Sequence, residues 1–127
     1  MRPSYITLSS AAPGVLRGFY EALGLVVSRE GPGALICFSL GPLTLALYPA
    51  EALSAELGVA LPQGGLGRTL ISLNVDSAQE VDAWMARAQA AGARITRPAE
   101  RAAWGGYRGY FLDPEGNPWE LVFNPRA

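Results

Sequence analysis

The alternation of polar and apolar residues changes period several times along the chain, and each change predicts an element. Residues 5–9 alternate as a half-buried strand does, and apolar residues then recur at helical spacing over residues 15–23. We expect Ser9 or Ser10 to cap this helix at its N-terminus. Turn residues divide the rest of the first half, which predicts strands at 25–28, 34–40 and 43–48 and a short helix at 50–57.

The second half repeats this order of elements. A strand-like run at 70–75 precedes a predicted helix, which Ser77 and Glu80 begin as a capping box and Gly92 ends. The remaining elements are strands at 94–97, 107–112 and 119–123, the last two joined by a turn at 113–118. Each half is therefore strand, helix, strand, strand, strand, and we predict an α+β protein of two βαβββ modules.

The repeat also sets the expected domain organisation. Ile6-Thr7-Leu8 in the first half matches Ile71-Ser72-Leu73 in the second half. We expect a single domain over residues 1–127, made of modules 4–58 and 68–125, because a chain of this length forms one core. One helix covers one face of a four-stranded sheet, so pairing the modules would create a concavity between the sheets that suits a ligand.

Composition and charge exclude several classes of protein. Half of the residues are hydrophobic and 17% are charged, which excludes an intrinsically disordered chain. Ten basic residues against eleven acidic ones, with no basic run, predict no nucleic-acid partner. No apolar run approaches the roughly 18 residues of a membrane span, and the N-terminal sequence lacks the apolar stretch of a signal peptide. We therefore expect a cytoplasmic protein with no membrane partner.

The chain contains no histidine, and this removes the commonest catalytic sites. Ser-His-Asp and Cys-His catalysis are excluded, as are zinc and iron sites that depend on histidine. General acid–base chemistry would fall to Glu, Asp, Tyr or a water molecule. The single cysteine, Cys37, lies in an apolar run and is interpreted as a buried core residue in preference to a reactive thiol.

Two motifs carry a resemblance to a known family. Residues 19–25, Phe-Tyr-Glu-Ala-Leu-Gly-Leu, resemble the first-helix signature of the vicinal oxygen chelate superfamily. This superfamily includes glyoxalase I, the bleomycin-resistance proteins, fosfomycin-resistance enzymes and extradiol dioxygenases. Residues 113–121, Asp-Pro-Glu-Gly-Asn-Pro-Trp-Glu-Leu, resemble its C-terminal turn and last strand. The resemblance implies paired βαβββ modules that form an open, U-shaped barrel, commonly in a homodimer.

The resemblance also identifies the positions at which metal-dependent relatives carry their ligands. These positions match Tyr5 and either Thr44 or Ala46 in the first module, and Leu70 and Glu120 in the second. Glu120 is a conventional ligand, whereas a phenol or a hydroxyl is not readily deprotonated at neutral pH. We therefore expect no metal and no other cofactor. Glu120 is predicted to orient a ligand or to act as a catalytic base, and the alternative is a relic of a metal site, held by Tyr5 or Arg108.

The segment 102–111, Ala-Ala-Trp-Gly-Gly-Tyr-Arg-Gly-Tyr-Phe, is the most unusual part of the sequence. It resembles the Trp-Gly-Gly segment of a metal-poor subgroup of the superfamily. In fosfomycin-resistance relatives the residue that matches Tyr110 is a phenol facing the cleft, and alternation then puts Arg108 on the same face. The alternative is an edge hairpin whose aromatic side chains pack on the core. The predicted ligand-binding residues are Tyr5, Phe38, Trp104, Tyr107, Arg108 and Tyr110.

Three functions are compatible with these features. The first is a small-molecule binding protein that holds an aromatic or amphipathic ligand between the modules, where Trp104, Tyr107 and Tyr110 stack on it. Arg108 and Glu120 would orient that ligand. The second is a glyoxalase- or lyase-type enzyme with Glu120 as base, either metal-free or with a weak metal that the substrate completes. The third is one half of a dimeric assembly without a conventional ligand. We expect the first, because the sequence offers neither a metal cage nor a histidine.

Overall fold

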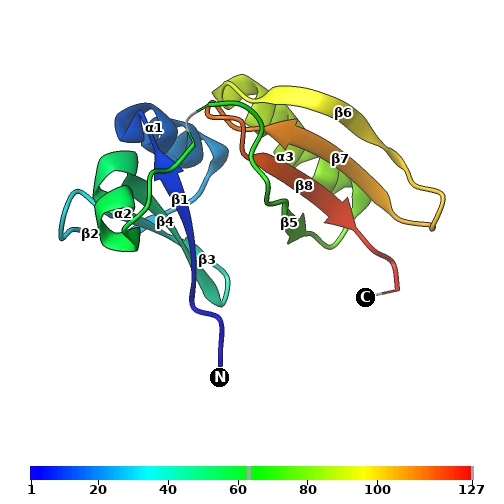
Figure 1. Ribbon diagram of the computed structural model, residues 1–127. Coiled ribbons are helices and arrows are strands. Elements are labelled where there is room, and N and C mark those ends of the chain that lie inside the picture. The colour runs from blue at the N-terminus through cyan, green and yellow to red at the C-terminus, as the bar shows by residue number, and fades with distance from the viewer. Residues whose placement is uncertain (63, 127) are drawn as a thin grey trace. The chain divides into compact units, whose positions relative to one another are not determined.

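The computed structural model describes residues 1–62 and 64–126, which fall into two compact units, unit 1 over 1–64 and unit 2 over 65–127 (Figure 1). The elements of unit 1 are β1 (Tyr5–Ser10), α1 (Pro13–Leu23), β2 (Val27–Glu30), β3 (Ile36–Leu40), β4 (Leu43–Pro49) and α2 (Ala50–Leu57). Those of unit 2 are β5 (Ile71–Asn74), α3 (Ala78–Ala91), β6 (Arg94–Arg101), β7 (Tyr107–Leu112) and β8 (Pro118–Phe123). The predicted α+β class and the βαβββ order of both halves are confirmed.

The two sheets have the same topology. Their strand orders are β1-β4-β3-β2 and β5-β8-β7-β6, and neither sheet closes into a barrel. In each unit the first and last strands pair in parallel, and the remaining neighbours are antiparallel. That the two units make up one domain with a ligand cleft stays a prediction. None of the described helices is both long and apolar enough to cross a membrane.

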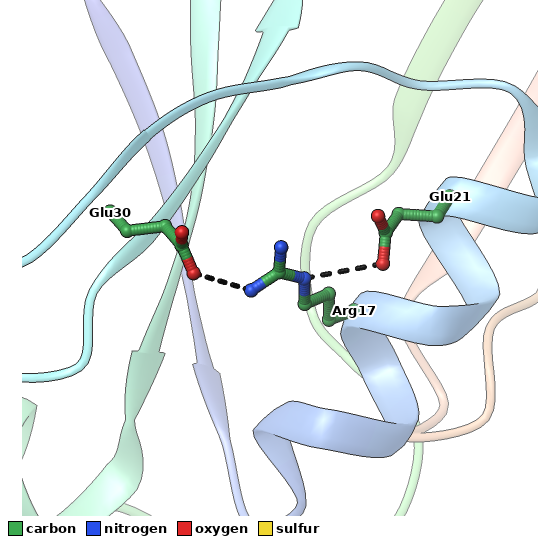
Figure 2. A network of polar contacts seen from close by, with 3 residues as sticks. All are labelled: Arg17, Glu21 and Glu30. Atoms are coloured by element: carbon green, nitrogen blue, oxygen red, sulfur yellow. Dashed lines mark hydrogen bonds and ion pairs between the residues drawn. The ribbon is translucent and has the colours of Figure 1, made fainter.

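Unit 1 has its core between α1 and one face of its sheet. The buried side chains of α1 include Tyr20, whose ring centroid lies 5.9 Å from that of the fully buried Phe38. On the outer side of α1, Arg17 donates through Nε to Glu21 Oε1 at 3.2 Å and through Nη1 to Glu30 in β2 (Figure 2). This network joins the helix to an outer strand, although exposed ion pairs of this kind contribute little to stability.

The two long helices begin in different ways. In α3, Ser77 Oγ accepts a hydrogen bond from Glu80 N at 3.1 Å, as the predicted cap requires. The Glu80 carboxylate accepts in return from Asp76 N at 2.6 Å, one residue before the expected partner. The expected cap of α1 by Ser9 or Ser10 is wrong. Its N-cap is Ala12 without a side-chain bond, because β1 continues through Ser10 and the sheet uses both serines.

Strand β6 is four residues longer than predicted. Pro98 lies in this extension, although proline cannot donate to a sheet ladder. The strand is at the edge of its sheet, and its pairing with β7 shifts register between Ile95 and Arg97 and again between Arg97 and Glu100. These irregularities accommodate the proline, and the strand continues to Arg101.

Helix α3 covers one face of the sheet in unit 2 (Figure 1). Trp119 and Phe111 stack on that face, with their ring centroids 6.3 Å apart. Gly109 lies so close to the helix that a Cβ there would be 2.7 Å from Met85 Cε of α3. The same Cβ would be 3.1 Å from the backbone nitrogen of Ala99 in the neighbouring strand β6. The only helix among the described residues of unit 2 is α3, so no helix of this unit covers the opposite face, here called the open face.

Candidate functional site

A tight turn sets the register of the strands that carry the candidate site. Asp113, 4% exposed, accepts hydrogen bonds from the backbone nitrogens of Glu115 and Asn117, each at 2.9 Å, and from Asn117 Nδ2 at 2.8 Å. These bonds fold the segment between β7 and β8 into its turn. The resulting register pairs Tyr110 with Glu120 across the two strands.

Side-chain alternation puts one group of polar residues on the open face. Gly109 faces α3, so its neighbours Arg108 and Tyr110 project to the other side. Trp119 is buried against Phe111, so Glu120 also projects to the open face. We call the residues on this face the open-face cluster; its members are Ser72, Arg97, Glu100, Arg108, Tyr110 and Glu120.

Glu120 is at the centre of the cluster, between residues of both neighbouring strands. Ser72 Oγ on β5 donates a hydrogen bond to Glu120 Oε1 at 2.7 Å, and Tyr110 on β7 pairs with Glu120 across the two strands. Burial raises the pKa of Tyr110, and the neighbouring Glu120 carboxylate raises it further. Tyr110 is therefore a neutral donor at physiological pH. Within unit 2 this carboxylate is held by Ser72, and the ion-pair partner of Arg108, which the relic interpretation named, is Glu100.

Arg108 is the buried cation of the cluster. Its guanidinium carbon lies 5.5 Å from the centroid of the Tyr110 ring, within the range of a cation–π contact. The residue is only 7% exposed, and its Nη1 atom makes no hydrogen bond to any described residue. Glu100 Oε1 is 3.6 Å from Nη1, whereas it accepts a hydrogen bond from Arg97 Nε at 2.9 Å. Arg97 lowers the pKa of Glu100 chiefly through this bond, and Arg108 adds a smaller effect.

The structure does not bring the other predicted ligand-binding residues of unit 2, Tyr107 and Trp104, into this cluster. Tyr107 is on the helix side, where its hydroxyl donates to Asp82 of α3 at 2.7 Å, and this bond raises the pKa of the phenol. Trp104 is 47% exposed in the turn between β6 and β7, where its ring lies against Gly106: a Cβ there would be 2.0 Å from the indole. Tyr110 and Glu120, by contrast, pair well inside β7 and β8.

The two predicted residues of unit 1 have other partners. Phe38 is fully buried beneath α1 and contacts Tyr20, so it is part of the core. The hydroxyl of Tyr5, which is 48% exposed, accepts a hydrogen bond from Arg29 at 2.8 Å. Hydrogen bonding to Tyr5 raises the pKa of Arg29. Of the predicted site residues, the structure thus brings together Arg108, Tyr110 and Glu120.

The strand register shows which residue of unit 1 corresponds to Glu120. Thr7 pairs with Ala46 in unit 1, and the matching Ser72 pairs with Glu120 in unit 2. The position equivalent to Glu120 is therefore Ala46, which has no donor atom in its side chain. Among residues 1–62 and 64–126, no three His, Cys, Asp or Glu side chains gather to hold a metal ion. The family's metal does not fit these residues, because Glu120 is joined only by hydroxyl groups.

Sequence reasoning missed half of the cluster. Ser72 carried a signal, because strand alternation puts it on the same face as Leu70, the position matched to a metal ligand in relatives. Arg97 and Glu100 carried none, because they fall at and beyond the predicted end of β6.

Two grooves of the structure lie outside the cluster. One, of about 560 Å³, is lined by residues of α2 and the segment after it, and one of about 440 Å³ lies at the ends of β5 and β8.

Comparison with known proteins agrees with the fold and with the motifs. Three of the similar solved structures illustrate this. A glyoxalase-related enzyme from Fulvimarina pelagi has 32% identity over 98% of this chain and 89% of that one, with a TM-score of 0.89. A lactoylglutathione lyase from Agrobacterium tumefaciens has 26% identity over 97% and 93%, with a TM-score of 0.74. A family member from Burkholderia phytofirmans PsJN, at 22% identity over 94% and 96% and a TM-score of 0.84, shows the fold alone.

The family assignment comes from the sequence itself. No curated protein matches the chain. The model of the Glyoxalase/Bleomycin resistance protein/Dioxygenase superfamily matches residues 15–121, which spans both units. The resemblance to the vicinal oxygen chelate proteins is thereby confirmed, and the chain belongs to the Glyoxalase/Bleomycin resistance protein/Dioxygenase superfamily.

Proposed function

We propose that this protein binds a small aromatic or amphipathic molecule on the open face of the sheet in unit 2, without a metal ion. The observation that carries the proposal is the row formed by Ser72, Glu120, Tyr110 and Arg108 across three adjacent strands. It combines a flat ring, a carboxylate and a buried cation within one side-chain layer. Such a combination of apolar surface and a few oriented polar groups is typical of ligand sites.

The roles of the side chains follow from their chemistry. The Tyr110 ring offers a stacking surface, and its neutral hydroxyl is a donor on the strand beside Glu120. A carboxylate has about four lone-pair sites, so Glu120 retains acceptor capacity for a donor group of the ligand after bonding Ser72. We further propose that the protein is cytoplasmic and a homodimer, because the outer strands of both sheets leave edges that a second chain would cover.

The proposal is tested by the affinity of variants for a planar aromatic compound found by thermal-shift screening. Tyr110→Leu should weaken binding by about 1–3 kcal/mol, the range for losing a buried stacking contact. Glu120→Gln should also alter the affinity while leaving the fold intact. Tyr107→Leu is the matched control, since its ring is on the helix side of the same strand. Calorimetry that gives equal affinities for Tyr110→Leu and the unmodified protein would refute the proposal.

A second candidate is a glyoxalase- or lyase-type enzyme with Glu120 as base. Glu120 favours it, because this carboxylate remains at the position of a ligand in metal-dependent relatives and one similar structure is a lactoylglutathione lyase. The hydrogen bond from Ser72 weighs against it, because it occupies part of the carboxylate that a base would use to take up a proton. An assay for lactoylglutathione lyase activity decides between the two: turnover without added metal that is lost in Glu120→Gln would establish the enzyme.

A further inference from the structure

The inference concerns Arg108 and Glu100, and it deepens the proposed function, on which it rests. We propose that Arg108 binds an anionic group of the ligand, a carboxylate or an anion of similar shape, and that Glu100 occupies this position until the ligand replaces it. The open face would then select planar anions over neutral molecules of the same size.

Arg108 is a buried cation with a hydrogen-bonding atom, Nη1, that is not used. It is 7% exposed, and its Nη1 atom is buried without a hydrogen-bond partner among the described residues. An unpaired buried donor costs free energy, and a charged one costs more than a neutral one. An acceptor that reaches Nη1 at hydrogen-bond distance would therefore be bound more favourably than at an exposed arginine.

Glu100 partly compensates this charge from a poor position. Its Oε1 atom is 3.6 Å from Arg108 Nη1, beyond hydrogen-bond distance, while the same atom is held by Arg97 Nε at 2.9 Å. The Glu100 side chain is 53% exposed, so it can turn into solvent without leaving a buried charge. Arg97, which is 56% exposed, can move with it. The internal carboxylate is thus displaceable, whereas Arg108 is fixed by burial and by the Tyr110 ring.

The neighbouring groups give the anion an orientation. A carboxylate matches the planar fork of a guanidinium and accepts two parallel hydrogen bonds from it. The Tyr110 ring, 5.5 Å from the guanidinium carbon, is positioned to contact an aromatic body attached to that carboxylate. Glu120, which pairs with Tyr110 from β8, repels an anion and accepts from a donor. A ligand should therefore place its anionic end at Arg108 and its donor end at Glu120.

The test uses benzoate and benzamide, two planar probes of nearly equal shape that differ in charge. Each is titrated into ¹⁵N-labelled protein at constant ionic strength, and chemical shifts are followed along β6 and β7. Benzoate should perturb Arg97, Glu100, Arg108 and Tyr110, and benzamide should bind more weakly. Glu100→Gln removes the competing charge and should tighten benzoate binding by about two- to fivefold, as expected for losing a partly exposed ion pair. Binding of benzamide should not change.

Two control variants make the result specific. Glu56→Gln removes one negative charge from the exposed surface of α2 in unit 1 and should leave benzoate binding unchanged. Arg108→Gln should abolish the preference for benzoate, and Glu100→Gln keeps the test decisive if that buried substitution unfolds the protein. Equal benzoate affinity of Glu100→Gln and the unmodified protein overturns the inference and leaves the proposed function standing. The inference is also overturned if benzoate shifts no resonance of β6 or β7 in the unmodified protein or in Glu100→Gln. The proposed function is then tested separately by the ligand affinity of Tyr110→Leu.

Discussion

Replacing Asp113 by alanine should destabilise the protein more than any exposed substitution, because one buried carboxylate organises the turn before β8. The change removes the hydrogen bonds that Asp113 accepts from the backbone nitrogens of Glu115 and Asn117 and from Asn117 Nδ2. A hydrogen bond to a charged acceptor contributes roughly 1.5–3 kcal/mol. Both nitrogens belong to half-buried residues, so water replaces part of this loss. We expect the free energy of unfolding to fall by about 2–4 kcal/mol.

Urea denaturation followed by circular dichroism measures this difference, and a graded series tests its cause. Asn117→Ala removes only the side-chain bond of 2.8 Å and retains both backbone bonds, so it should cost about 1 kcal/mol. Glu56→Ala, on the exposed surface of α2, should change the free energy by less than roughly 0.5 kcal/mol. The reasoning is wrong if the free energy of unfolding of Asp113→Ala is within roughly 0.5 kcal/mol of that of the unmodified protein, which is the range of surface substitutions. It is also wrong if Asn117→Ala lowers that free energy as much as Asp113→Ala does.

Three further predictions concern the turn, the cluster and the assembly. Gly116→Ala should lower the free energy of unfolding, measured by urea denaturation, by about 3 kcal/mol, and Gly58→Ala should lower it by about 1 kcal/mol. Both glycines have a similar positive φ. Of the two, only Gly116 would bring a Cβ against a backbone atom, the Gly65 oxygen at 2.3 Å. Equal costs would contradict the close approach. Glu120→Gln should lower the pKa of Tyr110 toward its ordinary value without reaching it, because burial is the larger cause of the raised pKa. Carbon NMR of labelled tyrosine measures this pKa, and an unchanged value would count against the contact between Tyr110 and Glu120. Because that pKa is raised in the folded protein, its contribution to stability is complete below about pH 10 and is lost as the pH rises through the raised value. Light scattering should give a homodimer, and a clean monomer of 13.4 kDa at micromolar concentration would contradict it.

The elements could be predicted well because their signals are local. Apolar spacing gave both long helices, and turn residues separated the strands in the order that the structure shows. The exceptions have physical reasons. Ser10 belongs to the sheet because its pairing with Pro49 outweighs the capping preference of serine. Strand β6 passes Pro98 because it is an edge strand whose pairing tolerates irregular register.

The candidate site could be predicted only where alternation alone decides the face of a side chain. Trp119 is apolar and Glu120 is not, so the side of Glu120 followed from period two, and Arg108 and Tyr110 followed in the same way. Period two also puts Tyr107 on the helix side, which the aromatic composition of its segment obscured. The contact between Arg108 and Glu100 depends on two register shifts in β6, and no short-range pattern in the sequence encodes them.

Crystallographic soaking of planar fragments, some neutral and some carrying a carboxylate, tests the central claim most directly, because it shows where ligands bind without assuming their identity. The account predicts electron density for a fragment against the Tyr110 ring, with a polar atom at hydrogen-bond distance from Glu120 or Arg108. The contradictory result is a set of fragments that leaves these three side chains untouched and gathers instead in the groove beside α2, between Ala50 and Leu61.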